Sequence, residues 1–247
     1  MPAAPHAEDR SVLDLPAPGP DLVLSYGDLP EHVVDVRFGS ADRPLVVLVH
    51  GGFWRPEYDR LHLRPLADAL ARQGWSSAAI EYRRVPGDPD ATVDDVASAI
   101  RTVSVAEELA GRSNGRLVLV GHSAGGHLVA HAAVDPLPQV VGVVPLAPVV
   151  DLALGEELGL GDGAVRAFLG GPAAGRPDLD PVRLPEPRVP VTVVHGTADE
   201  IVPLALAESY ARRHPQVRVR PVDGGHFAVI DPRSSAWPTL LEALDAR

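Results

Sequence analysis

Ser123 stands in a stretch of sequence that suits a reactive hydroxyl group. Residues 121–126 read Gly-His-Ser-Ala-Gly-Gly, directly after the apolar run 117–120 and before a helical stretch that begins near Ala124. A serine in a sharp turn between a strand and a helix is lifted above the sheet, and glycines at 121 and 125 avoid collisions with neighbouring backbone. The pattern predicts that Ser123 is a nucleophile.

A serine hydroxyl needs a base with a pKa near 7 and a third group that orients this base. Two loops could supply these groups, and each follows an expected strand. They are residues 195–199 (His-Gly-Thr-Ala-Asp) and residues 224–226 (Gly-Gly-His). The carboxyl ends of parallel strands lie at one edge of a sheet, so distant residues can meet there. We expect His226 to be the base and Asp199 to orient it, in the chain order Ser123, Asp199, His226.

Other acids and histidines near these loops have competing interpretations. Asp151 follows the apolar run 140–146 and stands at a second position that can carry the acid, whereas Glu200 is expected to be solvated. His127 and His131 have the spacing of a zinc pair, but the glutamate of a metalloprotease motif is replaced by leucine at position 128. We therefore expect structural histidines and no metal.

The segment 50–54, His-Gly-Gly-Phe-Trp, follows the apolar run 45–49. Backbone N–H groups stabilise the oxyanion of acyl transfer, and we assign this role to Gly52, Phe53 and Ala124. His50 and His122 are expected to brace their loops through hydrogen bonds.

The same region offers candidates for substrate contacts. Trp54 and Tyr58 can line the site, although packing against the sheet is the commoner fate of such an aromatic ring as Trp54. Arginines near the expected mouth could bind a substrate carboxylate, or form ion pairs at the rim: Arg55, Arg83 and Arg84.

Composition narrows the function classes. The net charge of −11 argues against nucleic acid or an anionic membrane as partner. The chain has no cysteine and no lysine, which excludes thiolate sites, Schiff-base chemistry and a lysine-dependent phosphate loop. We expect no cofactor and a small-molecule substrate. The start of the chain is not typical of a signal peptide and no run is long enough to span a membrane, so we expect a cytoplasmic protein, of unpredicted oligomeric state.

Strand-like and helix-like segments alternate along the chain, which predicts a doubly wound, mostly parallel sheet with helices on both faces. Residues 1–20 form a Pro- and Ala-rich extended arm to which we assign no catalytic role, and residues 21–247 form one domain. The alternation fails between 151 and 190, which predicts a small lid with one short helix near 163–169. The other expected elements are strands at 33–38, 45–49, 76–82, 117–120, 140–146, 191–195 and 217–222, and helices at 59–73, 92–110, 124–134, 203–214 and 234–246.

The four loops together resemble the α/β-hydrolase superfamily, over about residues 26–244. Within it the chain is most similar to the esterase and kynurenine formamidase branch, which has an H-G-G-x-W loop, and Glu81-Tyr82-Arg83-Arg84 also resembles its members. The resemblance implies the α/β-hydrolase fold, a lid inserted at 151–190, and no metal or organic cofactor.

We expect a serine hydrolase that cleaves a small carboxylic ester or an aryl formamide through an acyl-enzyme. A prolyl-oligopeptidase-like peptidase is an alternative, although no large gating domain is present. A thioesterase or acyltransferase is also open, because an acyl-enzyme can react with an alcohol or amine as well as with water. A ligand-binding protein that kept the fold and lost catalysis is the alternative outside the enzymes.

Overall fold

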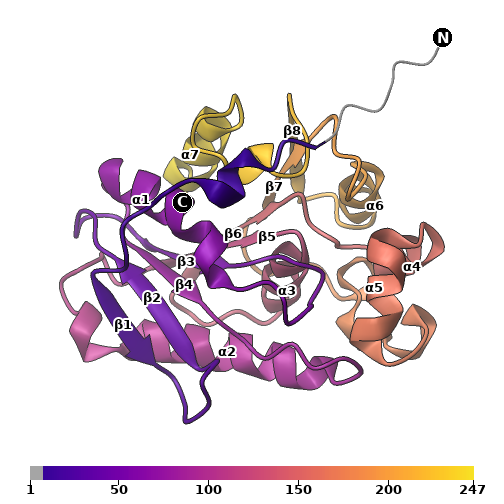
Figure 1. The fold of residues 1–247 in the computed structure, drawn as a ribbon, viewed down its shortest axis with the longest axis horizontal. Coiled ribbons are helices and arrows are strands. Elements are labelled where there is room, and N and C mark those ends of the chain that lie inside the picture. Colours follow the sequence, from indigo (N-terminus) through magenta and orange to yellow (C-terminus); the bar gives the residue numbers. More distant parts are fainter. Residues whose placement is uncertain (1–7) are drawn as a thin grey trace.

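The computed structural model describes residues 8–247, which form an eight-stranded sheet covered by helices on both faces (Figure 1). The strand order is β1-β2-β4-β3-β5-β6-β7-β8. β1 and β2 are antiparallel to their neighbours, and the remaining pairs are parallel. The strands are β1 Leu22–Ser25, β2 Val33–Arg37, β3 Leu45–Val49, β4 Ser77–Ile80, β5 Leu117–His122, β6 Val140–Leu146, β7 Thr192–Gly196 and β8 Arg218–Val222. This confirms the predicted α/β-hydrolase fold.

Side chains of the central strands alternate between two apolar cores. In β3, for example, Val47 belongs to the core beneath α2, α3 and α6, whereas Val46 and Leu48 belong to the core beneath α1 and α7. All five residues of β3 are buried, as a strand covered on both faces must be. The helices are α1 Arg64–Arg72, α2 Pro89–Val105, α3 Ala124–Ala132, α4 Leu152–Glu157, α5 Leu160–Leu169, α6 Ala205–Arg213 and α7 Trp237–Asp245.

The predicted strands are all present, with ends that differ by one or two residues, and two short elements were missed. β1 pairs with β2 at the edge of the sheet, and α4 precedes α5 in the 151–190 interval. The prediction that a helix opens at Thr92 was wrong. α2 begins at Pro89, where the side chain of Asp88 accepts a hydrogen bond from the Ala91 N–H at 3.3 Å.

The N-terminal segment is more ordered than a featureless arm. Residues 1–7 lie outside the described residues, but Ser11–Asp14 form a 3₁₀ turn and the side chain of Val12 is only 1% exposed, in the core beside α1 and α7. Across residues 8–247, none of the helices has both the length and the apolar character that a bilayer crossing needs.

Candidate active site

Ser123 occupies a strained turn at the end of β5. Its backbone has φ 55° and ψ −115°, a region that non-glycine residues rarely adopt and that costs on the order of 1–3 kcal/mol. The Ser123 N–H donates to the carbonyl of Leu146 in β6 at 2.8 Å, which fixes the turn to the sheet. A Cβ at Gly121 would overlap the backbone of Gly125, and a Cβ at Gly125 would overlap the backbone at the end of β3. The glycines flanking this serine therefore serve the close approach that the sequence predicted.

His226 and Asp199 form a buried hydrogen-bonded pair. His226 Nδ1 lies 2.7 Å from Asp199 Oδ2, and the two side chains are 3% and 0% exposed. The other carboxylate oxygen of Asp199 accepts the backbone N–H groups of Ile201 at 2.9 Å and Val202 at 2.7 Å. Burial alone would raise the pKa of Asp199, but hydrogen bonds from His195 and His226 outweigh it and hold this pKa below its usual value. Asp199 is thus a fixed anion hydrogen-bonded to Nδ1 at the edge of the imidazole.

Ser123 and His226 line one cavity of about 340 Å³ at the carboxyl ends of the strands. Because Nδ1 of His226 is engaged by Asp199, Nε2 is the ring nitrogen left for other partners. The wall of the cavity is mostly apolar and includes Phe53, Leu61 and Phe227. A volume near the lower end of the range for ligand pockets suits a small substrate.

The loop after β3 approaches the serine turn closely. A Cβ on Gly51 would lie 2.9 Å from the His122 carbonyl oxygen and from Ser123 Cβ. Gly52 and Phe53 both have positive φ, 106° and 53°, and both line the cavity. Among the described residues, the backbone N–H groups of Gly52, Phe53 and Ala124 have no acceptor. Donors without partners beside a candidate nucleophile are suited to an oxyanion.

A buried polar network supports this loop from below. His50 Nε2 lies 2.8 Å from Glu81 Oε1, and Glu81 also pairs with Arg84. The Tyr82 hydroxyl donates to the His50 carbonyl at 2.8 Å, and the two rings stack 4.2 Å apart. Burial acts to raise the pKa of Glu81, but His50 and Arg84 lower it to about 2. The residues after β4 thus hold the loop after β3, and His50 braces it as expected.

The three arginines predicted as possible ligands of a substrate carboxylate bind other protein groups. Arg83 pairs with Asp95 at 2.6 Å, Arg84 is bound to Glu81, and Arg55 donates to the carbonyl of Gly161. None of these arginines lines the cavity.

The two aromatic residues expected to contact substrate, Tyr58 and Trp54, lie in different surroundings. Tyr58 lines the cavity and packs over Gly52, and its contact with substrate stays a prediction. Trp54 is 3% exposed and stacks on Phe168 of α5, with ring centroids 4.4 Å apart. The expectation that Trp54 contacts substrate is therefore corrected to a packing role, because its ring is buried against Phe168 and does not line the cavity.

The 151–190 segment also has a different role from the one expected. Its residues do not line the cavity with Ser123 directly. Instead α5 supplies Phe168, on which Trp54 stacks, and the Gly161 carbonyl, which Arg55 binds, and so holds the loop after β3. Asp151, the rival acid, accepts hydrogen bonds from the Leu154 N–H at 2.9 Å and the Ser209 hydroxyl at 2.6 Å, which is a capping role.

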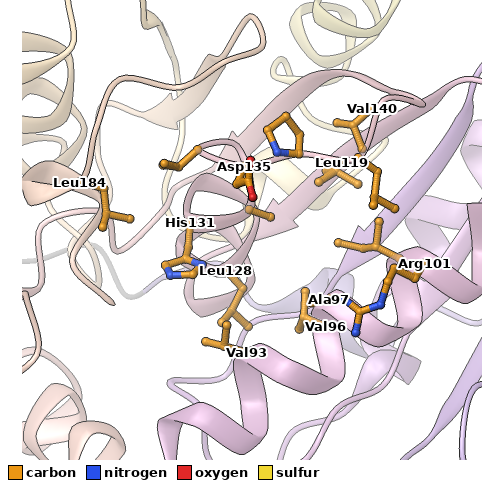
Figure 2. A pocket seen from close by; sticks show the side chains of 15 residues that line it. Val93, Val96, Ala97, Arg101, Leu119, Leu128, His131, Asp135, Val140 and Leu184 are labelled. Atoms are coloured by element: carbon orange, nitrogen blue, oxygen red, sulfur yellow. The ribbon is translucent and has the colours of Figure 1, made fainter. Parts of the chain in front are cut away.

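The histidines of α3 bind backbone rather than metal. His127 Nε2 lies 2.8 Å from the Leu179 carbonyl, and His131 Nε2 lies 3.2 Å from that of Asp178. Within residues 8–247, no group of three or more potential ligands is placed to hold a metal ion. His131 also borders a second cavity of about 270 Å³ between α2 and α3, where the side chains are mostly apolar (Figure 2).

Sequence reasoning missed the N-terminal contribution to the site. Arg10 and Leu13 line the cavity, and the Arg10 guanidinium lies over the Phe227 ring, 5.3 Å from its centroid. Glu8 accepts hydrogen bonds from the backbone of His226 at 2.9 and 3.0 Å. The only signal in the sequence is an apolar pair, Val12-Leu13, within an otherwise polar and Pro-rich stretch.

Comparison with known proteins agrees with this geometry. The BD-FAE family model matches residues 37–213, which is well over half of the chain. The chain belongs to the BD-FAE family. The match runs from the end of β2 to α6, and it includes the loop after β3 and the turn that carries Ser123.

Relatives within and around the family are esterases and formamidases. Esterase LipC of Mycobacterium tuberculosis is 27% identical over 76% of this chain and 53% of its own length. Kynurenine formamidase of Danio rerio is 32% identical over 52% of this chain and 46% of its own length. The chain thus spans about half the length of the curated relatives it matches.

Solved structures give the same fold over nearly the whole chain. A putative thioesterase from Silicibacter sp. TM1040 has a TM-score of 0.73 and 27% identity, and covers 91% of this chain and 86% of its own. Esterase B from Lactobacillus rhamnosis has a TM-score of 0.74 at 21% identity, covering 93% of this chain and 87% of its own, and supports the fold alone. These comparisons place the BD-FAE chain in the esterase and formamidase branch of the α/β-hydrolases.

Proposed function

We propose that this BD-FAE chain is a serine hydrolase that cleaves a small carboxylic ester or an aryl formamide through an acyl-enzyme. The observation that carries the proposal is that Ser123 and His226 line one cavity, while His226 Nδ1 lies 2.7 Å from Asp199 Oδ2. The fixed carboxylate keeps the proton on Nδ1 and leaves Nε2 as a base. Within residues 8–247 the N–H groups of Gly52, Phe53 and Ala124 have no acceptor, and Gly52 and Phe53 line the same cavity as Ser123.

In this mechanism Ser123 Oγ attacks the acyl carbon while His226 Nε2 takes the hydroxyl proton. Negative charge moves to the carbonyl oxygen, where the backbone N–H groups of Gly52, Phe53 and Ala124 stabilise it. The tetrahedral intermediate expels the alcohol or amine, which takes the proton from His226. Water then repeats the sequence on the acyl-enzyme and releases the acid. Asp199 stabilises the imidazolium in both halves.

A small, largely apolar substrate fits the modest, mostly apolar cavity. Tyr58 lies beside residues 50–54, the proposed oxyanion loop, and is the proposed contact for the acyl or leaving group. The names of the relatives support both substrate classes: an esterase, LipC, and a kynurenine formamidase. No step requires a cofactor.

The test is steady-state and pre-steady-state hydrolysis of p-nitrophenyl esters of rising chain length, with N-formylkynurenine in parallel. A burst of p-nitrophenol is expected with short-chain esters. A preference for the formamide of at least ~100-fold in kcat/KM, about 2.7 kcal/mol, would assign formamidase activity. If the folded protein cleaves none of these substrates, the proposal is wrong.

A further inference from the structure

Glu8 binds the backbone of the loop that carries His226. Its two carboxylate oxygens accept the His226 N–H at 2.9 and 3.0 Å, and one of them accepts the Glu200 N–H at 3.3 Å. Glu200 directly follows Asp199. One carboxylate from the N-terminal segment therefore ties together the two loops that hold the proposed base and its acid. A hydrogen bond to a charged acceptor is stronger than one between neutral groups.

The peptide of His226 is held on its other side as well. His122 Nε2 donates to the His226 carbonyl at 3.0 Å. Burial, and then repulsion from His226 and His62, place the pKa of His122 well below its usual value, so this ring remains a neutral donor. Glu8 and His122 thus hold the N–H and the carbonyl of the residue whose side chain is the base.

Gly225 provides the space for this contact. A Cβ built on Gly225 would overlap the Glu8 carboxylate, 2.6 Å from its carbon, and the φ of Gly225 lies outside the left-handed region. The backbone at 225 could therefore accept alanine. What alanine would displace is Glu8.

The segment that carries Glu8 is anchored independently of it. Val12 is buried in the core beside α1 and α7, and Arg233 donates to the Ser11 hydroxyl at 2.8 Å. Loss of the Glu8 side chain therefore leaves the rest of the segment in place.

We propose that Glu8 is a positioning residue, which fixes the His226 loop so that the imidazole faces Ser123. The inference rests on the proposed function, since it concerns the base of that reaction. Displacements of about 1 Å at a catalytic group can reduce the rate about 100-fold. A Glu8→Ala variant is expected to lose about 10- to 100-fold in kcat, with KM changed less than about 2-fold.

The test is a double-mutant cycle of Glu8→Ala and Gly225→Ala, with p-nitrophenyl acetate as substrate. Each single variant and the double variant should lose the same factor in kcat, because alanine at 225 removes only what Glu8 supplies. Glu8→Gln, which keeps one acceptor oxygen, should recover part of the loss. Asp9→Asn, which removes an exposed charge from the same segment, is the matched control and should keep wild-type kcat.

Two outcomes separate this inference from the function it rests on. If folded wild-type protein hydrolyses none of the test substrates, the proposed function fails first. If wild type gives a burst and Glu8→Ala keeps its kcat, or the two losses multiply in the double variant, the positioning role is wrong. Thermal melting of each variant identifies any loss of rate that comes from unfolding.

Discussion

Replacement of Asp199 by asparagine tests which ring nitrogen of His226 carries the proton. The test is possible because both oxygens of the Asp199 carboxylate have fixed partners. Oδ1 accepts two backbone N–H groups, from Ile201 and Val202, whereas Oδ2 faces His226 Nδ1. The amide oxygen of asparagine must face the two N–H donors, so its NH₂ group must face the imidazole. His226 Nδ1 then has to accept a hydrogen bond, which moves the ring proton to Nε2. A ring protonated at Nε2 cannot take the proton of Ser123.

The expected loss follows from this wrong tautomer. Asp→Asn at the corresponding position of a chymotrypsin-like triad reduces kcat about 10⁴-fold, and we expect the same order here, about 5.5 kcal/mol in the barrier. The assay is kcat for p-nitrophenyl acetate, with circular dichroism to confirm folding. Asp151→Asn is the matched control, because Asp151 caps α4 away from the cavity, and it should stay within about 3-fold of wild type. A kcat for Asp199→Asn within 10-fold of wild type, or a larger loss in Asp151→Asn, would refute the reasoning.

Two further predictions concern the support of the oxyanion loop. Because the pKa of Glu81 is lowered to about 2 from an ordinary 4.5 on folding, its stabilising effect is present above pH 4.5 and is lost as the pH falls towards 2. Glu81→Gln should therefore lower the free energy of unfolding by roughly 3 kcal/mol at pH 7 and by little near pH 2, measured by urea denaturation; a difference independent of pH would contradict this. Trp54→Ala removes a buried ring stacked on Phe168 and should cost about 3–5 kcal/mol in the same assay, whereas a change below about 1 kcal/mol would show that the ring is not packed as described.

The sheet and the serine turn were predictable because their signals are local. Buried parallel strands such as β3 are short continuous apolar runs, and the glycines around Ser123 report close backbone contacts that the fold requires. The order of Ser123, Asp199 and His226 after β5, β7 and β8 was enough to predict that Asp199 and His226 would meet.

What the sequence could not predict depends on long-range packing. Nothing local distinguishes Trp54 in the core from Trp54 in the cavity, since its burial depends on Phe168 in α5, more than a hundred residues later. Glu8 and His226 are in contact although they are 218 positions apart in the sequence. The sequence around Glu8 gives no local sign of this contact and suggests only an extended arm. A parallel sheet specifies where strands end, but not which distant segment covers them.

The central claim is that Ser123 is the nucleophile, and site-specific labelling tests it most directly. Wild-type protein treated with a fluorophosphonate and digested should carry the label on the peptide that contains Ser123, while Ser123→Ala should take up no label, lose ester hydrolysis and melt at the wild-type temperature. A label on any other residue, or ester turnover that survives in Ser123→Ala, would contradict the account.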